Sequence, residues 1–465
     1  MRISCNSWGG DVARDLTKGS IIRNLMYMSL PTMIGFSSQM VYDIVDIFWI
    51  GRISSEAIAG VTIFSTLFWT VEVLNSIIGQ SSISLISQSY GRKDLNATNR
   101  SIEQTITFKC LVAIIAAILV ALFLKPALTF FSDDQLVINA ALDYGYIRLF
   151  FLPIMFSSYS VNTALRCVGN ARTPMMIMIL ASIINITLDP VLIFDTVPLI
   201  GLPGAGLGVF GAAVATITSQ TIAFLIGFTV LFSGKQGISP RIRGLFRLHW
   251  PTDKKLLTVG LPTGIEGLLR NLSGVIVLRF VAVFGTAAVA ATGVAGRLFG
   301  FAFMPLVGLS MGGSTIVGQS LGVNEIERAR RTAQLSGILG AFFLFFFVAV
   351  AFLVGPHVMG LFSDDPEIIA LGTTFLRIGS VGLIFLAYGF GLSTVFSGSG
   401  FNLPFMYASV VARWAVQIPV LIITITWLKM DIVWVWWSYF LSDFSEFVVM
   451  LFYYKKGTWR FKRVG

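Results

Sequence analysis

The chain has 465 residues, of which 55% are hydrophobic and only 12% are charged, and its mean hydropathy is +0.82. This composition excludes a soluble globular protein, because a surface that faces water needs a larger share of charged residues. The net charge of +10 is explained by basic residues that set membrane topology and attract anionic lipid headgroups, so no nucleic-acid partner is expected.

Apolar stretches long enough to cross a bilayer recur along the whole chain. About 20 apolar residues are needed for one crossing. Such windows begin near residues 26, 58, 107, 147, 175 and 211, and then near 258, 292, 335, 377, 405 and 433. The sequence therefore predicts an all-α polytopic membrane protein with twelve transmembrane helices, one for each window.

Three short strings of the first half return in the second half, each 231 residues later. LPT at 30–32 returns at 261–263, QSYG at 88–91 returns as QSLG at 319–322, and FSDD at 131–134 returns at 362–365. A constant offset indicates two copies of one unit. An even number of helices per copy keeps both copies in one orientation, so we expect two six-helix bundles related by a pseudo-twofold axis along the membrane normal.

Basic residues gather in every second loop, and short loops rich in Lys and Arg stay in the cytoplasm. Both termini are therefore expected in the cytoplasm, with the protein in the plasma membrane. The linker between the copies is expected to be a solvated tether. The predicted organisation is a cytoplasmic N-terminal segment (1–25), an N-lobe (26–233), a cytoplasmic linker (234–257), a C-lobe (258–454) and a basic cytoplasmic tail (455–465).

Ionisable residues inside the windows are functional candidates, because a charge at the bilayer centre costs about 2.5–3.5 kcal/mol on insertion scales. Asp43 and Asp46 are three residues apart in the first window and share one helix face. Loss of water and a second carboxylate both favour the protonated form, so one of them could carry a proton. For Asp43, pairing with an arginine or a backbone amide is an equal alternative, whereas Asp46 is favoured as functional.

Two features of the first copy suggest a cation site and a bend. Asn185 and Asp189 lie one turn apart, and an amide oxygen beside a carboxylate offers the oxygen ligands that a hard cation prefers. Pro31 and Pro262 occupy equivalent places in the first helix of each copy. Proline removes a helical hydrogen bond and permits bending, although a static kink inherited through duplication fits equally well.

The second copy is richer in arginine. Glu266 and Arg270 have the i, i+4 spacing of an ion pair, and both mutual neutralisation and contact with a substrate remain open. The histidines and cysteines are isolated and form no metal-ligand or catalytic pattern, so an enzyme is not expected. The arginines of its windows are Arg270, Arg279, Arg297, Arg377 and Arg413.

Several strings together resemble the multidrug and toxic compound extrusion (MATE) family of prokaryotes. They are VYDIVDIFWIGR at 41–52, INITLDPVLIF at 184–194, GAAVAT at 211–216, FMPLVGLSMGGSTIVGQSLG at 303–322 and GTWR at 457–460. The resemblance implies an antiporter, driven by H+ or Na+, that exports amphipathic and mostly cationic compounds by alternating access. It implies no cofactor, with small organic molecules and membrane lipids as partners. Because the two copies already supply both halves of a transporter, a monomer suffices, and a dimer stays open.

The resemblance also carries roles to individual residues. Asp46 matches the family's coupling carboxylate, and Asn185, Asp189 and Thr216 match the residues that complete a cation site, where Na+ is possible. Pro31 is implied as the bending point of the first helix. Polar residues that match the N-lobe cavity, where substrate would bind, are Tyr42, Tyr144 and Asn162.

Two positions depart from the family pattern, and they keep an alternative open. Asp43 stands where relatives often have asparagine, which adds a second acid, and Arg270 stands where some branches have a glutamate, which makes a C-lobe sodium site doubtful. The alternative is a flippase of the same fold for a lipid-linked or anionic headgroup, because arginines in a cavity would attract phosphate. Arginines paired with carboxylates would instead favour drug export.

Overall fold

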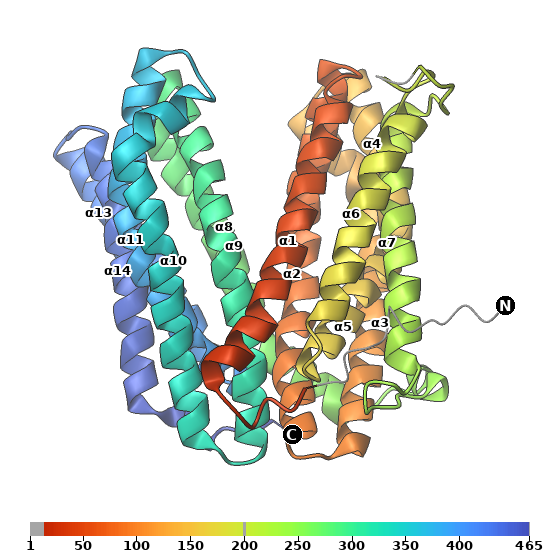
Figure 1. Ribbon diagram of the computed structural model, residues 1–465. Coiled ribbons are helices and arrows are strands. Elements are labelled where there is room, and N and C mark those ends of the chain that lie inside the picture. Colours follow the sequence, from red (N-terminus) through yellow and green to blue (C-terminus); the bar gives the residue numbers. More distant parts are fainter. Residues whose placement is uncertain (1–13, 199–200, 465) are drawn as a thin grey trace. The chain divides into compact units, whose positions relative to one another are not determined.

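The computed structural model describes residues 14–198 and 201–464, and these residues are almost entirely helical (Figure 1). The described part contains no strand, only an isolated bridge between Thr196 and Pro203. The helices are α1 (Ile21–Ile50), α2 (Ser55–Gly91), α3 (Leu95–Phe131), α4 (Gln135–Phe150), α5 (Leu152–Cys167), α6 (Arg172–Ile193), α7 (Gly208–Phe232), η1 (Ile242–Phe246), α8 (Trp250–Ala282), α9 (Thr286–Gly322), α10 (Ile326–Gly360), α11 (Pro366–Ser399), α12 (Leu403–Val410), the π-helical η2 (Val411–Gln417), α13 (Ile418–Leu421), the π-helical η3 (Ile422–Trp427), α14 (Val433–Lys456) and η4 (Thr458–Phe461).

Eight described helices are long and apolar enough to cross a membrane, and α4 with α5 makes a ninth if this bent pair is one span. The segment Leu403–Trp427, which runs from α12 to η3, counts as one of the eight. Helices α1, α8 and α14 fall outside this set. Charged residues lower the mean hydropathy of a window, and each of these helices carries charged residues in its interior. Their interior charges are Asp43 and Asp46 in α1, Glu266 and Arg270 in α8, and Asp443 and Glu446 in α14.

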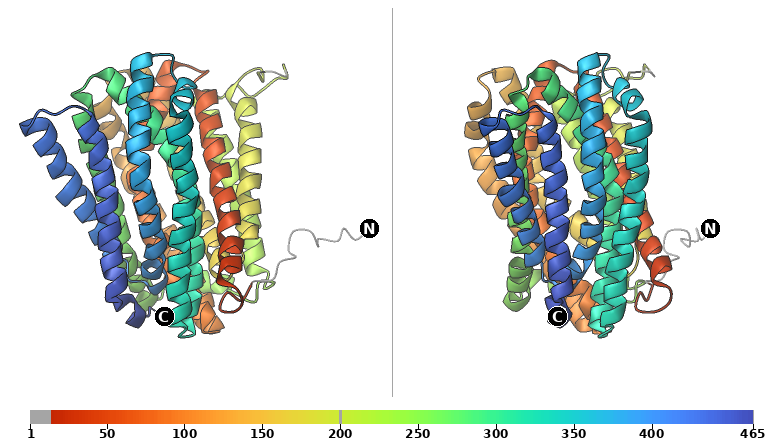
Figure 2. Two further views of the ribbon diagram at one scale, coloured as in Figure 1. Left: turned by 60° about the vertical axis from the view of Figure 1, so that its left-hand side comes forward. Right: turned by 90° about the vertical axis from the view of Figure 1, so that its left-hand side faces the viewer.

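The chain forms two compact units. The first holds residues 34–258 with the stretch that ends at Asp15, and the second holds residues 16–33 and 259–465. Helix α1 thus begins in the second unit and enters the first at Ile34, whereas α8 begins in the first and enters the second at Val259. Within each unit the helices run side by side along their length (Figures 1 and 2).

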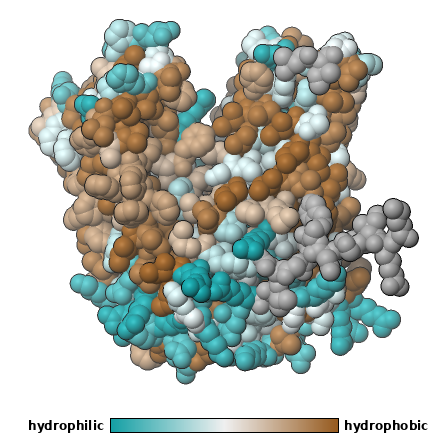
Figure 3. Space-filling model, viewed as in Figure 1, coloured by the Kyte–Doolittle hydropathy of each residue, from teal (hydrophilic) through white to brown (hydrophobic). Residues whose placement is uncertain are grey.

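Each unit has an apolar middle and a polar end. Hydrophobic side chains cover the middle of the helices in each unit, and hydrophilic ones gather toward an end of each unit (Figure 3). In the first unit, α2 packs against α3, α4 and α5, and α6 packs against α7; in the second, α11 packs against α9, α10 and α14. An apolar band of this kind is what a bilayer core requires.

The duplicated FSDD strings form the same helix cap in both copies. Asp134 precedes α4, where its Oδ1 accepts a hydrogen bond from Leu136 N at 2.8 Å, and Asp365 precedes α11, where its Oδ1 accepts from Glu367 N at 2.9 Å. A carboxylate at this position satisfies a backbone amide that the helix itself leaves without a partner. The repeat is thus a structural feature, which explains why it lies at a helix start.

Two turns after helix ends also recur 231 residues apart. Lys93 and Asn324 follow α2 and α9 with φ values of 60° and 67°, although neither is a glycine. Gly169 and Gly400 follow α5 and α11 with φ values of 88° and 76°, a region that glycine enters without steric cost. Each copy therefore repeats its backbone conformation in two separate turns, which supports duplication independently of the sequence strings.

The fourth predicted window corresponds to a broken helix that starts earlier than residue 147. Helices α4 and α5 meet at Phe151 with a bend of 54°. Pro153 lies at the start of α5, and because proline has no backbone N–H it ends the hydrogen-bond ladder of the preceding helix. The apolar window that begins near residue 147 located α5 and missed most of α4, whose start is fixed by the Asp134 cap.

The linker between the copies is not the solvated tether that the sequence suggested. Gln104 of α3 donates through Nε2 to Arg247 O at 2.6 Å and accepts at Oε1 from His249 N at 2.8 Å. Thr107 of the same helix donates to Leu245 O at 2.8 Å. Polar side chains near the start of α3 thus satisfy backbone groups of the linker, which holds it against the first unit.

Arg328 of α10 binds the chain segment just before α1. Its guanidinium donates to Leu16 O at 2.8 and 3.1 Å, to Lys18 O at 3.0 Å and to Gly19 O at 2.9 Å. A planar guanidinium with several fixed donors suits such a set of carbonyls, whereas a lysine would offer one point charge. Gln319 of α9 also accepts a hydrogen bond from Leu16 N at 3.3 Å, so side chains of two helices hold the segment to the second unit.

Replacing Arg328 by Met should release this segment. Hydrogen bonds from a charged donor contribute about 1.5–3 kcal/mol each to stability, so hydrogen exchange in the peptide that spans residues 15–20 should become at least about tenfold faster. Arg331→Met is the matched control, because Arg331 is 67% exposed and pairs with Glu327 of its own helix. Unchanged exchange in the Arg328 variant would show that other contacts hold the segment.

Candidate functional site

The first unit contains a buried carboxylate whose partners come from distant parts of the chain. Asp46 of α1 is 6% exposed, and its Oδ2 accepts a hydrogen bond from the Tyr144 hydroxyl of α4 at 3.2 Å. That hydroxyl in turn accepts from Arg148 Nη1 at 3.1 Å. Arg148 lies one turn beyond Tyr144, so a single helix face presents both groups to Asp46. Helices α1 and α4 thereby build a carboxylate–tyrosine–arginine chain.

A second polar group links α6 to α7 in the same unit. Asn185 Nδ2 donates to Asp189 Oδ1 at 3.3 Å and to Thr216 Oγ1 at 3.4 Å. Asp189 and Asn185 are fully buried, and Thr216 is 2% exposed. The Asn185–Asp189 pair has the one-turn spacing that the sequence predicted, and packing of α6 on α7 adds Thr216. The charges of Asp46 and Asp189 lie near enough to act on each other.

Three buried oxygens of these groups have no hydrogen-bond donor among the described residues. They are Asp46 Oδ1, Asn185 Oδ1 and Asp189 Oδ2. Buried acceptors without a donor are costly, and native proteins rarely leave them so. A proton, a cation or a water molecule would each satisfy such atoms. The site therefore has the donor set that a hard cation prefers, and also carboxylates that could bind a proton.

The remaining N-lobe predictions divide into residues beside this site and residues elsewhere. Tyr42 is 6% exposed and its hydroxyl accepts from Gln220 Nε2 at 3.4 Å, which links α1 to α7. Asp43 is exposed, although Arg148 acts electrostatically on both Asp43 and Asp46. Asn162 is buried in α5, and its Oδ1 has no partner within the described chain. No hydrogen bond joins Asn162 to the Asp46 group there.

Pro31 lies inside α1, close to where this helix changes units. The change falls between Met33 and Ile34. The Thr32 hydroxyl donates to Met28 O at 2.7 Å, a back-bond within the helix of a kind that often accompanies bending. Proline and a back-bonded threonine thus stand side by side, two residues before the chain passes into the first unit.

In the second unit, Glu266 and Arg270 form the ion pair that their spacing suggested, and the pair belongs to a larger network. Arg270 Nε lies 2.6 Å from Glu266 Oε1, and its Nη2 lies 2.8 Å from Glu446 Oε1 of α14. Arg413 of η2 reaches Asp443 Oδ1 at 3.4 Å and Glu446 Oε2 at 3.9 Å. Three carboxylates therefore share two arginines. These arginines are neutralised by neighbours.

Sequence reasoning missed three polar residues of the first unit. Arg148, Lys109 and Gln220 all lie within predicted windows, and the first two carry charges at membrane depth. The signal was present, because a lone basic residue inside an apolar window is as anomalous as a carboxylate. Arg148 also follows Tyr144 by one turn, a spacing that places both on one face.

Comparison with known proteins supports the architecture and names the family. A sequence model of the MatE family matches residues 31–191 and again residues 262–423, and the second match begins 231 positions after the first. The chain belongs to the MatE family. The unit that the family model describes therefore occurs twice along the chain, at the offset that the repeated strings had indicated. The family consists of transporters, so the chain is an integral membrane transporter and not an enzyme.

Similar curated proteins extend over nearly the whole chain. One is the probable multidrug resistance protein YoeA of Bacillus subtilis, 27% identical over 458 residues, which cover 97% of each chain. Another is the probable multidrug resistance protein NorM of Thermotoga maritima, 26% identical over 453 residues, which cover 96% of this chain and 94% of that protein.

Solved MATE structures share the fold. An outward-facing multidrug resistance MATE transporter of the MOP superfamily gives a TM-score of 0.85 at 22% identity, over 95% of this chain and 97% of that chain. A MATE structure in the straight conformation gives a TM-score of 0.87 at 22% identity over the same shares. The predicted fold class, with twelve transmembrane helices in two bundles, is thereby confirmed.

Proposed function

We propose that this MATE transporter is a cation-coupled antiporter that exports amphipathic, mostly cationic drugs or toxic compounds by alternating access. The observation that carries the proposal is the set of unpartnered buried oxygens on Asp46, Asn185 and Asp189. A transported H+ or Na+ would satisfy these atoms, and its release would leave them without a partner again. The names of the curated multidrug resistance relatives support the substrate class.

In this proposal each residue has a distinct part. Asp46 binds the coupling ion, Tyr144 holds the carboxylate in place, and Asn185 with Thr216 orients Asp189. An inward-moving cation gains about 2.3 kcal/mol per charge at a membrane potential of 100 mV, which suffices for a roughly 40- to 50-fold concentration ratio of a neutral substrate. The proposal also places the transporter in the plasma membrane as a monomer, with both termini in the cytoplasm.

Bending of α1 at Pro31 would connect ion binding to substrate release. The support is that α1 belongs to the second unit up to Met33 and to the first unit from Ile34 onward. A bend near Pro31 would therefore move the part of α1 that carries Asp46 without disturbing its start. Proline permits such a bend because it leaves one helical hydrogen bond unmade.

Pairing of the arginines favours drug export over a lipid-linked substrate. Arg270 and Arg413 bind carboxylates of α8 and α14, and Arg377 donates through Nη2 to Phe352 O at 3.1 Å. Of the five arginines in the windows of the second copy, Arg279 and Arg297 are exposed, and no ion pair joins them to another described residue. Arginines that are already neutralised have little positive field left to attract a phosphate.

Proteoliposomes with separately imposed pH and sodium gradients would test the proposal. Purified protein should move a fluorescent organic cation against its gradient when one of the two ion gradients is present, and should not do so in its absence. The ion whose gradient drives transport is the coupling ion. Failure under both gradients, with transport of a labelled lipid-linked substrate instead, would replace the antiporter proposal by the flippase.

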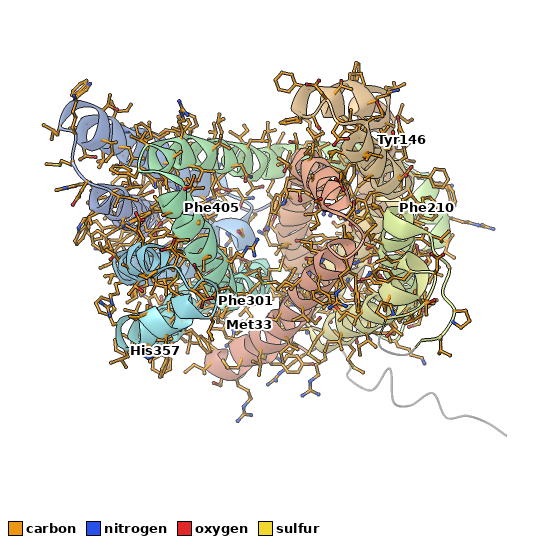
Figure 4. The ribbon with its side chains drawn as sticks, turned by 90° about the horizontal axis from the view of Figure 1, so that it is seen from above. Met33, Tyr146, Phe210, Phe301, His357 and Phe405 are labelled. Atoms are coloured by element: carbon orange, nitrogen blue, oxygen red, sulfur yellow. The ribbon has the colours of Figure 1, made fainter. Side chains whose placement is uncertain are left out.

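Tyr144→Phe should lower gradient-driven export about tenfold or more. The substitution removes one hydrogen bond to a buried carboxylate, which contributes about 1.5–3 kcal/mol, and it also releases Arg148. Tyr146→Phe is the matched control, because Tyr146 lies on the same helix and is 45% exposed (Figure 4). The measurement is the initial rate of dye export in the same proteoliposomes, and equal rates in the two variants would remove Tyr144 from the mechanism.

A further inference from the structure

Lys109 of α3 is a fully buried amine whose Nζ has no hydrogen-bond acceptor among the described residues. The Nζ lies 4.2 Å from the centroid of the Tyr159 ring and 6.0 Å from that of Phe156. The face of an aromatic ring favours the charged ammonium. An aromatic ring has no lone pair that could accept a normal hydrogen bond, so the three N–H donors of the Lys109 ammonium have no acceptor among the described residues. A buried charge without an acceptor is rare in native proteins.

The amine lies among polar residues from two further helices. Glu72, Asn75 and Gly79 are spaced by three and four residues and so lie along one face of α2. Tyr159, Asn162 and Arg166 have the same spacing on α5. Helices α2, α3 and α5 pack against one another, and in Figure 1 they lie together in the first unit.

Positive charge is in excess within this group. Glu72 and Arg166 are the charged residues that act on Lys109, so two cations face one carboxylate. That carboxylate is half-buried and already accepts from Asn75 Nδ2 at 2.8 Å. Arg166 is 4% exposed, and its Nη2 donates a hydrogen bond to Thr163 Oγ1 at 2.9 Å. One more negative charge would balance the group.

Gly79 leaves the room that this arrangement needs. A Cβ at Gly79 would lie 2.9 Å from Tyr159 Cε1 and 3.4 Å from Lys109 Nζ. A glycine in a helix interior costs about as much as a weak hydrogen bond relative to alanine. Its presence here keeps the Tyr159 ring and the Lys109 amine against α2. Tyr159 itself is half-buried, whereas Lys109 is fully buried.

We propose that Lys109 and Arg166 form a binding site for an anionic group, a carboxylate, sulfonate or phosphate, carried on an apolar or aromatic body. The anion would supply the acceptors that the Lys109 amine lacks, and the rings of Tyr159, Phe156 and Phe36 would contact the body. The site lies apart from Asp46 and holds whether or not the cation coupling proposed above is correct. Its ligand comes either from an exported solute or from a membrane lipid.

Binding of fluorescein, an aromatic dianion, to the full-length protein in phosphatidylcholine nanodiscs tests this site. Fluorescence anisotropy should show saturable binding above that of empty discs. Lys109→Met removes the charge and keeps an unbranched side chain that is one heavy atom shorter, and it should weaken binding about ten- to a hundredfold. Lys109→Arg retains the charge and should bind within a few-fold of the unchanged protein. Lys125→Met, an exposed lysine of the same helix, is the matched control and should change nothing.

Further arms separate the two sources of the anion. Discs that contain phosphatidylglycerol should lower dye binding if the site takes a lipid phosphate, and native mass spectrometry should then show that lipid retained less by the Lys109→Met protein. Dye binding that is equal in both kinds of disc assigns the site to a solute. If Lys109→Met does not fold, Arg166→Gln replaces it with the same expected loss. Fluorescein binding that is unaffected by loss of the Lys109 charge would overturn the proposal.

Discussion

Asp46→Asn is expected to abolish gradient-driven export of a fluorescent cation from proteoliposomes, down to the rate of liposomes without protein. Asparagine has the size of aspartate and can still accept a hydrogen bond from Tyr144, so the packing of α1 against α4 should persist. The amide, however, neither takes up a proton near neutral pH nor offsets the charge of a sodium ion. The variant should therefore fold and lose its coupling.

Two controls give this result its meaning. Asp43→Asn changes a carboxylate on the same helix that is exposed, and this variant should keep most of the export rate. Equilibrium binding of the same dye to the Asp46→Asn protein should persist, since the substitution removes ion binding alone. Unchanged export by intact cells that carry Asp46→Asn at normal expression would contradict the assignment of Asp46.

The fold could be predicted from two simple signals, and the helix ends could not. Apolar windows and the strings repeated 231 residues apart were enough for twelve helices in two copies. Helices continue past the apolar core wherever caps and polar contacts support them, as Asp134 does for α4 and as the linker contacts do for α3. Hydropathy counts only the part of a helix that meets lipid, so it misses these extensions.

The candidate site was predictable where its residues share a helix. The Asn185–Asp189 bond follows from a one-turn spacing, whereas the Tyr144–Asp46 bond joins residues 98 positions apart and was not predicted. The family resemblance had named the two residues separately. Spacing also placed Asp43 and Asp46 on one helix face. Three residues fall about 60° short of a full turn. Asp46 is buried beside α4 and Asp43 is exposed, so this rotation separates them.

Arg270→Met is expected to destabilise the second unit by about 3–5 kcal/mol at neutral pH. Arg270 is the hydrogen-bond partner of Glu266, at 2.6 Å, and of Glu446, at 2.8 Å, and the Glu446 side chain is fully buried. Removal of the arginine leaves both carboxylates without this donor, and Arg413 approaches Glu446 only to 3.9 Å. Thermal unfolding in detergent, followed by intrinsic fluorescence, should show a clearly lower melting temperature.

The size of this loss depends on charge and not on lost packing, because methionine fills much of the volume of the arginine stem. Glu266→Gln in the same chain removes one of the stranded charges, so the double variant should regain a large part of the stability. Acidification should act in the same direction, since protonation neutralises the stranded carboxylates. Arg279→Met, an exposed arginine on the same helix, should leave stability nearly unchanged. A double variant no more stable than Arg270→Met alone would show that the loss of stability does not come from the charge of the stranded carboxylates.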